Sequence, residues 1–564
     1  MIQRLRVGNA SGFYGDRFSA VREMLEGGPL DVLTGDYLAE LTMLILGRDR
    51  MKNPSGGYAR TFLRQMEDCL GLALERGVKI VVNAGGLNPA GLAVALRALA
   101  EKLGLRARVM HVEGDDVLPR ASELGFGTVL TANAYLGCWG IVACLKAGAD
   151  VVVTGRVTDA SLVVGAAAAH FGWARDDWNA LAGATAAGHV IECGPQACGG
   201  NYAFFREHDL RKPGFPIAEI AADGTSVITK HEASGGAVTV GTVTAQLVYE
   251  VTGARYAGPD VTLRLDSVTL EEEGVDRVRI AGVVGEPPPP TIKVCLNTVG
   301  GLRNDVTFVL TGLDIDAKAK LVRAQMEAAL RSKPPEEIAW TLSRTDHEDA
   351  DTEQGASALL RCVVKDRDPK VVGRDFSSAA VELALCSYPG FTLTAPPAEA
   401  SPFGVYRPAF IDAELVTHVA VLDDGTRLEI VPSSETRPLV DEAAPSLPPP
   451  LPAGPTRRVP LGTIAGARSG DKGGNANLGV WARTDDAFRW LVHALGVTEV
   501  QRLLPEAASL PVTRHVFPHL RALNFVIEGL LGEGVSSSVR FDPQAKGLGE
   551  WLRSRHVDVP ESLL

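Results

Sequence analysis

The sequence has few features of exported, membrane-spanning or nucleic-acid-binding proteins. Eight cysteines are scattered through 564 residues, with none after Cys386, so they build no disulfide framework and suit a reducing compartment. No run approaches the roughly 18 consecutive apolar residues of a membrane-spanning helix, and the first residues contain no apolar signal-peptide core. Basic residues are also fewer than acidic ones, since 56 Lys and Arg and 68 Asp and Glu give a net charge of −12. We therefore expect a cytoplasmic protein with neither a membrane nor a nucleic acid as partner.

Glycine and proline, by contrast, are abundant, with 60 and 34 residues. Several glycines follow short apolar runs, where a turn without a Cβ lets a ligand approach the backbone closely. Hydrophobic residues make up 46% and charged residues 22%, as in folded globular proteins. At roughly 100 to 200 residues per domain, the length favours about three domains.

A proline-rich segment, residues 441–458, divides the chain. Its six prolines and its scarcity of large apolar residues predict a linker that is neither helix nor strand. We expect a large α/β domain at 1–440, with candidate lobes at 1–255 and 256–440, and a compact domain at 459–564.

The first lobe alternates short apolar strands with amphipathic helices, which predicts a mostly parallel sheet with helical crossovers. Strands are expected at residues 5–7, 78–83, 107–112, 128–131 and 151–154, and helices at 62–76, 89–103 and 134–147. The next lobe is β-rich with one helix at 316–330, and is predicted to be α+β. The tail, with a helix expected over 486–504, alternates strands and helices like a ferredoxin-like α+β sandwich. Turns after parallel strands meet at the carboxyl edge of a sheet, which is the predicted site.

The turn after the first strand carries a phenol, a carboxylate and a guanidinium, from Tyr14, Asp16 and Arg17. Gly12 and Gly15 give it a spacing that only loosely resembles a dinucleotide fingerprint. The side chains lie where a helix N-terminus attracts anions, so we predict contact with an anionic substrate. Asp16 is equally well explained as the N-cap of the next helix.

The turn after the strand at 78–83 contains two glycines between two asparagines. Asn88 is explained by helix capping, whereas Asn83, Gly85 and Gly86 are expected to face a ligand. All four are candidates for substrate binding.

The turn after the strand at 151–154 holds Arg156, which is suited to bidentate binding of a carboxylate. Asp159 caps a helix, pairs with Arg156 or acts as a base, and the sequence leaves these three roles open. A later glycine-rich segment supplies Gly200 and Asn201, which are interpreted as another ligand-facing turn.

The most distinctive string runs from Ala467 to Asn477 in the tail. Its hydroxyl, carboxylate, ammonium, guanidinium and amide groups surround three glycines, so we predict a carboxylate or phosphate cradle. The alternative is a hairpin loop kept soluble by its charges. The spacing of a Walker A motif is absent, so ATP binding is not expected. Its candidate residues are Arg468, Ser469, Asp471, Lys472, Gly473 and Asn475.

No metal site is expected. Cys193 and Cys198 have a spacing that metal or redox pairs use, but no second pair or histidine cluster accompanies them. The acidic run at 346–351 is interpreted as a solvated turn rather than a cation site. His515 and His519 are four residues apart, but an intervening proline prevents a shared helical face.

These segments together make the chain resemble the acyclic terpene utilisation protein family over nearly its whole length. The resemblance rests on residues 12–17, 83–89, 133–137, 154–162, 199–201 and 467–477. It implies an N-terminal α/β domain joined to a C-terminal ferredoxin-fold domain. It also implies a role in pathways that degrade citronellol- and geraniol-type branched acids as coenzyme A thioesters, and it adds Asn133 to the candidate residues.

We therefore expect a cytoplasmic catabolic enzyme, a lyase or hydratase, that acts on a small branched or unsaturated carboxylic acid or its coenzyme A thioester. Coenzyme A enters only as part of the substrate, and no other cofactor is assigned. The catalytic candidates are Tyr14, Asp16, Asp159, Asp471 and Lys472. The substrate-binding candidates are Gly12, Gly15, Arg17, Asn83, Gly85, Gly86, Asn88, Asn133, Arg156, Gly200, Asn201, Arg468, Ser469, Gly473 and Asn475.

Two other functions stay open. One is a non-catalytic ligand-binding subunit of an acyl-CoA carboxylase complex, and the other is a nucleotide-dependent enzyme that uses the glycine turns for pyrophosphate. A homo-oligomer is expected for a chain of this size. The sequence leaves open whether the tail string reaches the sheet edge of its own chain or that of a neighbour.

Overall fold

The computed structural model describes residues 4–440 and 444–564. The chain forms two compact units, which we call the main unit and the small unit. The main unit comprises residues up to Asn297 together with 406–535 and 542–564, and the small unit comprises 298–405 and 536–541.

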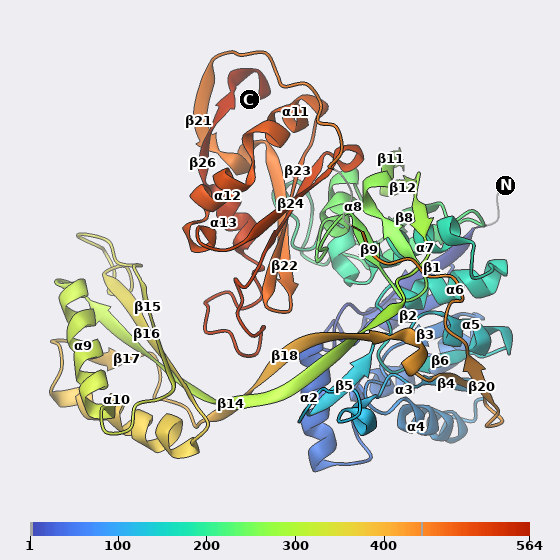
Figure 1. Ribbon diagram of the computed structural model, residues 1–564, viewed down its shortest axis with the longest axis horizontal. Helices are drawn as coiled ribbons and strands as arrows, with labels where there is room; N and C mark the ends of the chain where they lie inside the picture. The colour runs from blue at the N-terminus through green and yellow to red at the C-terminus, as the bar shows by residue number, and fades with distance from the viewer. Residues whose placement is uncertain (1–3, 441–443) are drawn as a thin grey trace. The chain divides into compact units, whose positions relative to one another are not determined.

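The main unit is built on one mixed sheet of eleven strands (Figure 1). Its central strands are parallel, in the order β1 (Leu5–Asn9), β2 (Val32–Gly35), β3 (Lys79–Val82), β6 (Val151–Thr154) and β4 (Val109–Glu113). One side continues antiparallel through β7 (Pro216–Ile220), β8 (Ser226–Lys230), β12 (Arg277–Ala281) and β11 (Thr269–Gly274). The other side continues antiparallel through β19 (His418–Val421) and β20 (Arg427–Ile430).

The prediction of a mostly parallel sheet is therefore correct for the centre and wrong for the outer strands. Short turns explain the difference, because parallel neighbours need a long crossover whereas a tight turn joins antiparallel strands. Asp223-Gly224 connects β7 to β8, and Asp424-Gly425 connects β19 to β20. Both glycines have positive φ, as such hairpin turns require.

Helices cover both faces of the central strands, so these strands are nearly continuous runs of buried β-branched residues. One face packs on α1 (Ala20–Glu26), α3 (Arg60–Glu75) and α4 (Pro89–Lys102). The other packs on α5 (Trp139–Lys146), α6 (Ser161–Phe171) and α7 (Trp178–Ile191). The helix expected over 134–147 begins only at Trp139. The reason is that Thr131–Ala134 form β5, three residues later than the expected strand, and pair with β14 (Thr291–Thr311).

The small unit is an antiparallel sheet with its own core. Its strands are β15 (Glu337–Ser343), β16 (Ser357–Asp366), the second half of β14, and β17 (Thr392–Leu393). Helix α9 (Ile315–Leu330), close to the helix expected at 316–330, buries Val322 and Met326 against Phe308 of β14 and Phe376 of α10 (Phe376–Val381).

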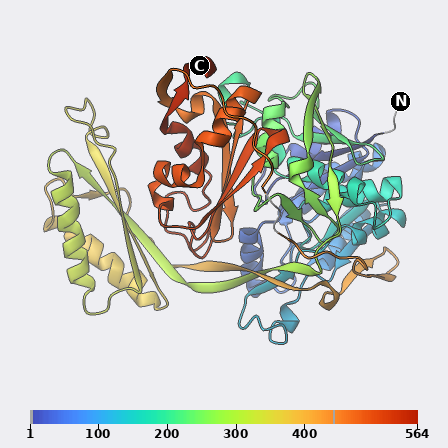
Figure 2. The same cartoon turned by 45° about the horizontal axis from the view of Figure 1, so that its top comes forward.

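The C-terminal domain belongs to the main unit (Figures 1 and 2). Its four antiparallel strands are β22 (Ala465–Lys472), β23 (Asn475–Ala482), β25 (Ala522–Ile527) and β24 (Val512–Phe517). Three helices share a core with this sheet: α11 (Asp485–Ala494), α12 (Val497–Leu503) and α13 (Leu548–Ser554). The single helix expected over 486–504 is two helices, because Leu495 and Gly496 leave helical geometry between them. Strand β21 (Thr456–Pro460) pairs with β26 (His556–Pro560).

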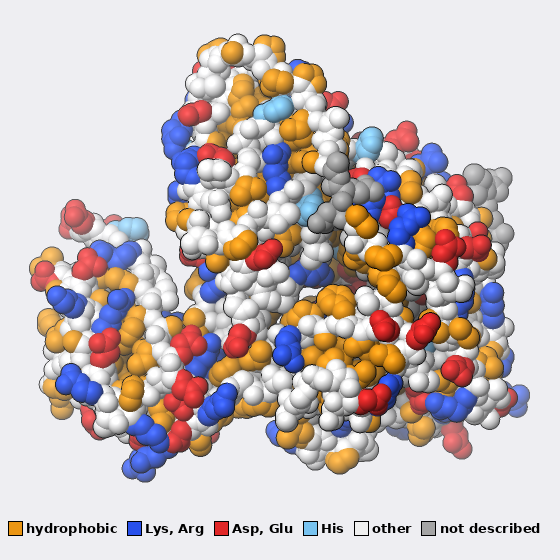
Figure 3. Space-filling view, in the orientation of Figure 1, with side chains coloured by type: hydrophobic (Ala, Val, Ile, Leu, Met, Phe, Trp, Pro, Cys, Tyr) orange, Lys and Arg blue, Asp and Glu red, His pale blue; other side chains and the backbone are white. Residues whose placement is uncertain are grey.

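The expected linker lies partly outside the described residues, which omit 441–443, and residues 444–455 form neither helix nor strand. In the part of the chain that the structure describes, no helix combines the length and apolarity needed to cross a membrane. Acidic and basic side chains are intermixed on the face shown in Figure 3, so the net negative charge forms no single patch there.

Candidate functional site

The turns that follow β2, β3 and β6 meet at the carboxyl edge of the parallel strands. Asn83, directly after β3, donates from Nδ2 to Oδ1 of Asp36, directly after β2, over 2.6 Å. Its Oδ1 accepts from the backbone N–H of Tyr37 over 2.7 Å. Burial raises the pKa of Asp36 well above its usual range, and the charge of Asp159 adds to this effect. The predicted edge is therefore rich in buried polar groups.

Arg156 is the most deeply buried cation at this edge, with 2% of its surface exposed. Its Nη1 donates to Oδ1 of Asp159 over 2.6 Å, and its guanidinium carbon lies 4.3 Å from the ring centroid of Tyr135. Its Nε finds no hydrogen-bond partner among the described residues. Nη1 of Arg156 also donates to the carbonyl oxygen of Leu38 over 3.4 Å. A buried charge with an unpaired Nε is suited to bind a second anion.

A second ion pair comes from α2 (Glu40–Lys52) and β14. Oε1 of Glu40, at the start of α2, lies 3.4 Å from Nζ of Lys293, and it accepts the hydroxyl of Tyr135 over 2.8 Å. Lys293 also lies 4.5 Å from the ring centroid of Tyr135 and 5.7 Å from that of Tyr406. Burial would raise the pKa of Glu40, but the charges of Lys293 and Arg156 outweigh burial and lower it.

The C-terminal domain supplies the third group of charges, and it does so within the same chain. Lys472, at the end of β22, lies 3.8 Å from Oε2 of Glu250, and Lys546 lies 3.4 Å from Oε1 of that carboxylate. Glu250 has a φ of 55°, which is uncommon for a residue with a Cβ. Burial and the charge of Glu250 raise the pKa of the neighbouring Asp471 to about 7.

The alternation of β23 explains how the hairpin reaches this position. Ala476, Leu478 and Val480 face the core of the C-terminal domain, so the residues between them face the rest of the main unit. Asn477 is one of these and accepts the backbone N–H of Glu250 over 2.6 Å. Gly479 is another, and a Cβ there would lie 2.6 Å from the carbonyl oxygen of Val248.

Electrostatic interactions join these groups into one set, which we call the ionic cluster. Its members are Glu40, Arg156, Asp159, Glu250, Lys293, Asp471, Lys472 and Lys546. Burial would lower the pKa of Lys472, but the charges of Glu250 and Glu40 outweigh it and raise that pKa. Burial does lower the pKa of Lys293, although Glu40 opposes the effect.

Buried polar atoms without partners border the ionic cluster. His189 and Glu192 are joined by a 3.0 Å contact between Nδ1 and Oε1. Nε2 of His189 and Oε2 of Glu192 find no hydrogen-bond partner among the described residues. Burial and the charge of Asp159 raise the pKa of Glu192, while His189 opposes the rise. Unsatisfied buried groups of this kind mark places where water or a ligand binds.

The ion pairs of the cluster remain within reach of solvent. Side chains of Asp159, Glu40, Lys293, Lys472 and Glu250 keep 28 to 30% of their surface accessible. A carboxylate from solution can therefore compete for these cations. Together with Asp471, whose pKa is raised to about 7, the cluster holds groups of the kinds suited to anion binding and to proton transfer.

The structure brings together five of the residues that the sequence singles out: Asn83, Arg156, Asp159, Asp471 and Lys472. Asn133 lies beside them and donates to Oδ2 of Asp115, which also accepts the backbone N–H of Arg156.

The candidate residues of the first turn, Tyr14, Asp16 and Arg17, are not members of the ionic cluster. Asp16 accepts the N–H groups of Gly12 and Arg17, so its carboxylate stabilises its own turn. Arg17 pairs with Glu23 and lies 4.9 Å from the ring centroid of Phe215, and lines a separate surface pocket of about 790 Å³. Tyr14 packs against the core that includes α1 and α3.

Several other candidates stabilise local structure. Asn88 caps α4, as the capping interpretation predicts, by accepting the N–H of Gly91. Ser469 accepts the N–H of Gly549, and Asn475 accepts that of Gly529. Arg468 stacks on Tyr249, donates to Gln196 and donates to the carbonyl oxygen of Asn201.

The glycines border protein atoms rather than open space. A Cβ at Gly85 would lie 2.4 Å from the carbonyl oxygen of Thr154, and one at Gly12 would lie 2.7 Å from the backbone of Cys193. The nearest atoms to a Cβ at the other four candidate glycines belong to Phe13 (Gly15), Leu46 (Gly86), Pro195 (Gly200) and Tyr406 (Gly473). These glycines permit close packing of the turns in which they lie.

The string from Ala467 to Asn477 is a β-hairpin rather than a long loop. Its residues pair along β22 and β23 up to Lys472 and Asn475, and Gly473 has a φ of 65° in the tight turn. The hairpin interpretation is therefore correct for the backbone. Residues from Ala467 to Gly470 are buried, so the segment is not a solvated loop.

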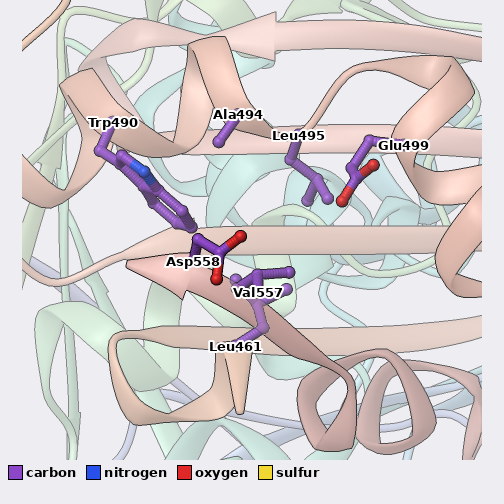
Figure 4. Close-up of a pocket in the computed structure, with 7 residues that line it drawn as sticks. All are labelled: Leu461, Trp490, Ala494, Leu495, Glu499, Val557 and Asp558. Atoms are coloured by element: carbon purple, nitrogen blue, oxygen red, sulfur yellow. The ribbon is translucent and has the colours of Figure 1, made fainter. Parts of the chain in front are cut away.

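In the described ranges, 4–440 and 444–564, no group of three or more His, Cys, Asp or Glu side chains is arranged to hold a metal ion. A small pocket of about 180 Å³ lies on the C-terminal domain, between Trp490, Leu495 and Val557 (Figure 4). Its lining contains no member of the ionic cluster.

Sequence reasoning did not single out Glu40, Glu250, Lys293 or Lys546, which follow no glycine-rich turn. Asp36, like Asn83, is a polar residue directly after a short apolar strand. The strand before Asp36, β2, is not among the strands predicted from the sequence. The positions of Glu40, Glu250, Lys293 and Lys546 depend on contacts between segments that are distant in the sequence.

The fold and the site define a mixed α/β protein whose C-terminal ferredoxin-like domain completes a partly buried ionic cluster. A family model described as acyclic terpene utilisation family protein AtuA matches residues 5–422, and one described as AtuA ferredoxin-like domain matches residues 459–558. The chain belongs to the AtuA family, which confirms the resemblance. No curated protein and no solved structure matches this chain.

Proposed function

We propose that the protein is a catabolic lyase or hydratase that acts on a small branched or unsaturated carboxylic acid or on its coenzyme A thioester. The observation that carries the proposal is that two successive residues of the ionic cluster, Asp471, whose pKa is raised to about 7, and Lys472, whose pKa is raised by Glu250 and Glu40, offer a proton-transfer group beside a cation. The family description refers to the use of acyclic terpenes, which are branched and unsaturated, and supports this substrate class.

Three cations are suited to hold the substrate. Arg156, Lys293 and Lys472 each face a carboxylate whose place an incoming carboxylate or thioester oxygen could share. Charge-assisted hydrogen bonds of this kind are about twice as strong as neutral ones. Positive charge beside a thioester carbonyl also stabilises the enolate that forms when its α-carbon loses a proton.

Asp471 is suited to move that proton. A general acid or base works best when its pKa lies near the working pH, and burial with the charge of Glu250 brings Asp471 into that range. In a hydration, water adds its oxygen to the β-carbon and a proton reaches the α-carbon. In the reverse elimination the same group removes the α-proton.

The experiment has a binding stage and a turnover stage. The full-length protein is mixed with branched unsaturated acids, their coenzyme A thioesters, straight-chain saturated acids, NAD or ATP, and its melting temperature is recorded. A ligand that binds the folded state raises the melting temperature. Ligands that bind are then incubated in deuterated water, and hydration, cleavage and α-deuterium incorporation are followed by mass spectrometry.

We expect Asp471→Asn to lower kcat by roughly 10² to 10⁴-fold, the usual contribution of a general acid or base. Lys472→Met should mainly raise KM. Asp486→Asn, on the exposed start of α11, is the matched control and should leave turnover unchanged. Full turnover by Asp471→Asn, or a stable complex with an acyl-CoA carboxylase in the absence of any turnover, would contradict the proposal.

A further inference from the structure

Lys293 has surroundings unlike those of the other lysines in the ionic cluster. Its ammonium lies beside two tyrosine rings, 4.5 Å from the centroid of Tyr135 and 5.7 Å from that of Tyr406. Among the described residues, the carboxylate paired with it is that of Glu40, at 3.4 Å. Its side chain keeps 29% of its surface accessible, so it is partly open to solvent.

Its backbone position is fixed on both sides. Lys293 is the third residue of β14, and its carbonyl oxygen accepts the N–H of Tyr135 over 2.9 Å. The next residue, Val294, pairs with Ala134 of β5. A residue on a paired strand places its side-chain nitrogen more reproducibly than one on a loop.

The surroundings of Lys472 and Lys293 shift their pKa values in opposite directions. Lys472 is acted on by Glu250, Glu40 and other carboxylates, which raise its pKa and keep it a cation. Burial lowers the pKa of Lys293, and the charges of Lys472 and Arg156 lower it further. A buried amine beside other cations is the usual setting of a lysine that acts as a nucleophile.

We propose that Lys293 forms an imine with the ketone carbon of a small branched oxo acid, or of its thioester, bound at the ionic cluster. This inference rests on the proposed function, because it uses the same anion-binding cations, and it narrows the substrate class to compounds that carry a ketone. Arg156 and Lys472 hold the carboxylate or thioester end, and Lys293 reaches the ketone.

The step balances within the site. Lys293 first gives up one ammonium proton to solvent. Its lone pair then attacks the ketone carbon, a carbon–nitrogen bond forms, and the carbonyl oxygen leaves as water with the two remaining hydrogens of the amine. One proton from solvent then converts the imine to an iminium ion. The bond that breaks joins the α- and β-carbons of the iminium, and its electron pair moves to the α-carbon to form an enamine. The β-carbon, which carries a hydroxyl, loses the hydroxyl proton to solvent and leaves as an aldehyde or ketone. The enamine then takes up a proton at the α-carbon, and water adds to the iminium carbon and releases the ketone product and the amine of Lys293.

Borohydride trapping tests the proposal on the full-length protein. The protein is mixed with pyruvate, acetoacetate or levulinate, whose ketone and carboxylate lie at increasing separation, and sodium borohydride is added. Hydride reduces an imine to a stable secondary amine, and peptide mass spectrometry locates the adduct. We expect the adduct on Lys293, at least tenfold above any other lysine, for one or more of these acids.

Two variants and one control complete the test. Lys293→Arg keeps the positive charge and should lose the adduct, while its melting temperature shows whether the fold persists. Lys79→Arg is the matched control, because Lys79 is also paired with a carboxylate, Asp150 at 2.8 Å, and is accessible. This control should keep the adduct on Lys293. An adduct spread over surface lysines, or no adduct on Lys293 in the wild-type protein, overturns the proposal. Neither of these two results contradicts the proposed function. That function is tested separately, by the binding of acids without a ketone and by the turnover of Asp471→Asn.

Discussion

The hydroxyl of Tyr135 donates to the same oxygen of Glu40 that lies 3.4 Å from Lys293. The phenol therefore holds the carboxylate that orients the lysine. A hydrogen bond from a neutral donor to a carboxylate favours its charged form and lowers its pKa.

Replacing Tyr135 by Phe tests this relationship, because it removes the hydrogen bond and keeps the ring on which Arg156 stacks. We expect the pKa of Glu40 to rise and the free energy of unfolding to fall by about 1 to 2 kcal/mol. Carboxylate NMR and denaturant unfolding measure the two quantities. Tyr388→Phe is the matched control, because it removes a 2.8 Å hydrogen bond to the carbonyl of Val309 in the small unit. An equal shift of Glu40 in both variants would show that its pKa does not depend on Tyr135.

Glu250→Gln should lower the pKa of Asp471 from its value of about 7. Burial is the largest cause of the raised value, and the negative charge of Glu250 is the second, so neutralising Glu250 removes the second cause only. The change is followed by carboxylate NMR or by the pH profile of turnover, whose acidic limb should move to lower pH. Glu499→Gln, on the surface of α12, should leave the profile in place. An unchanged pKa of Asp471 in Glu250→Gln would show that the charge of Glu250 does not influence it.

Asp115 makes stability depend on pH in a predictable direction. Burial raises its pKa to about 7, whereas an unfolded Asp titrates at about 3.9. The folded state then binds more protons than the unfolded state between these values, so stability falls as the pH rises from about 4 to about 7. Asp115→Asn should remove this slope and leave the variant more stable than wild type, by a few kcal/mol, above about pH 7. Denaturant titrations at a series of pH values compare the slopes, and parallel curves for the two proteins would refute the assignment.

Part of the site could be predicted from the sequence because its signals are local. Asn83, Arg156 and Asp159 follow short apolar strands, and parallel strands bring such residues to one edge whatever the rest of the chain does. The hairpin string likewise concentrates polar groups in one place, and two of them, Asp471 and Lys472, lie in the cluster. The central strands and helix α4 follow from the same local patterns.

The remaining parts depend on pairing between distant segments, which no local pattern specifies. Lys293 enters the site because β14 pairs with β5, about 160 positions earlier in the chain. Glu250 enters because the C-terminal sheet packs on the residues around Val248, a contact between two domains. The antiparallel pairing of the outer strands with the central sheet, such as that of β19 with β4, is also specified by no local pattern.

Asn477 and Asn475 lie on the same face of β23, two residues apart, and they allow the docking of the C-terminal domain to be tested. Asn477 is buried, accepts the N–H of Glu250 over 2.6 Å and donates to the carbonyls of Val248 and Val251 over 3.2 and 3.3 Å. Asn475 accepts a single N–H, from Gly529 at 2.9 Å, near the surface.

Asn477→Ala should therefore lower the free energy of unfolding by about 3 kcal/mol, because it leaves several buried backbone groups unpaired, and Asn475→Ala by about 1 kcal/mol. Loss of docking should also release Lys472 from Glu250, which weakens ligand binding at the ionic cluster. Denaturant unfolding and ligand-induced shifts in melting temperature measure the two effects. Equal losses in the two variants, or an Asn477→Ala protein that binds ligand like wild type, would show that docking through Asn477 does not build the site.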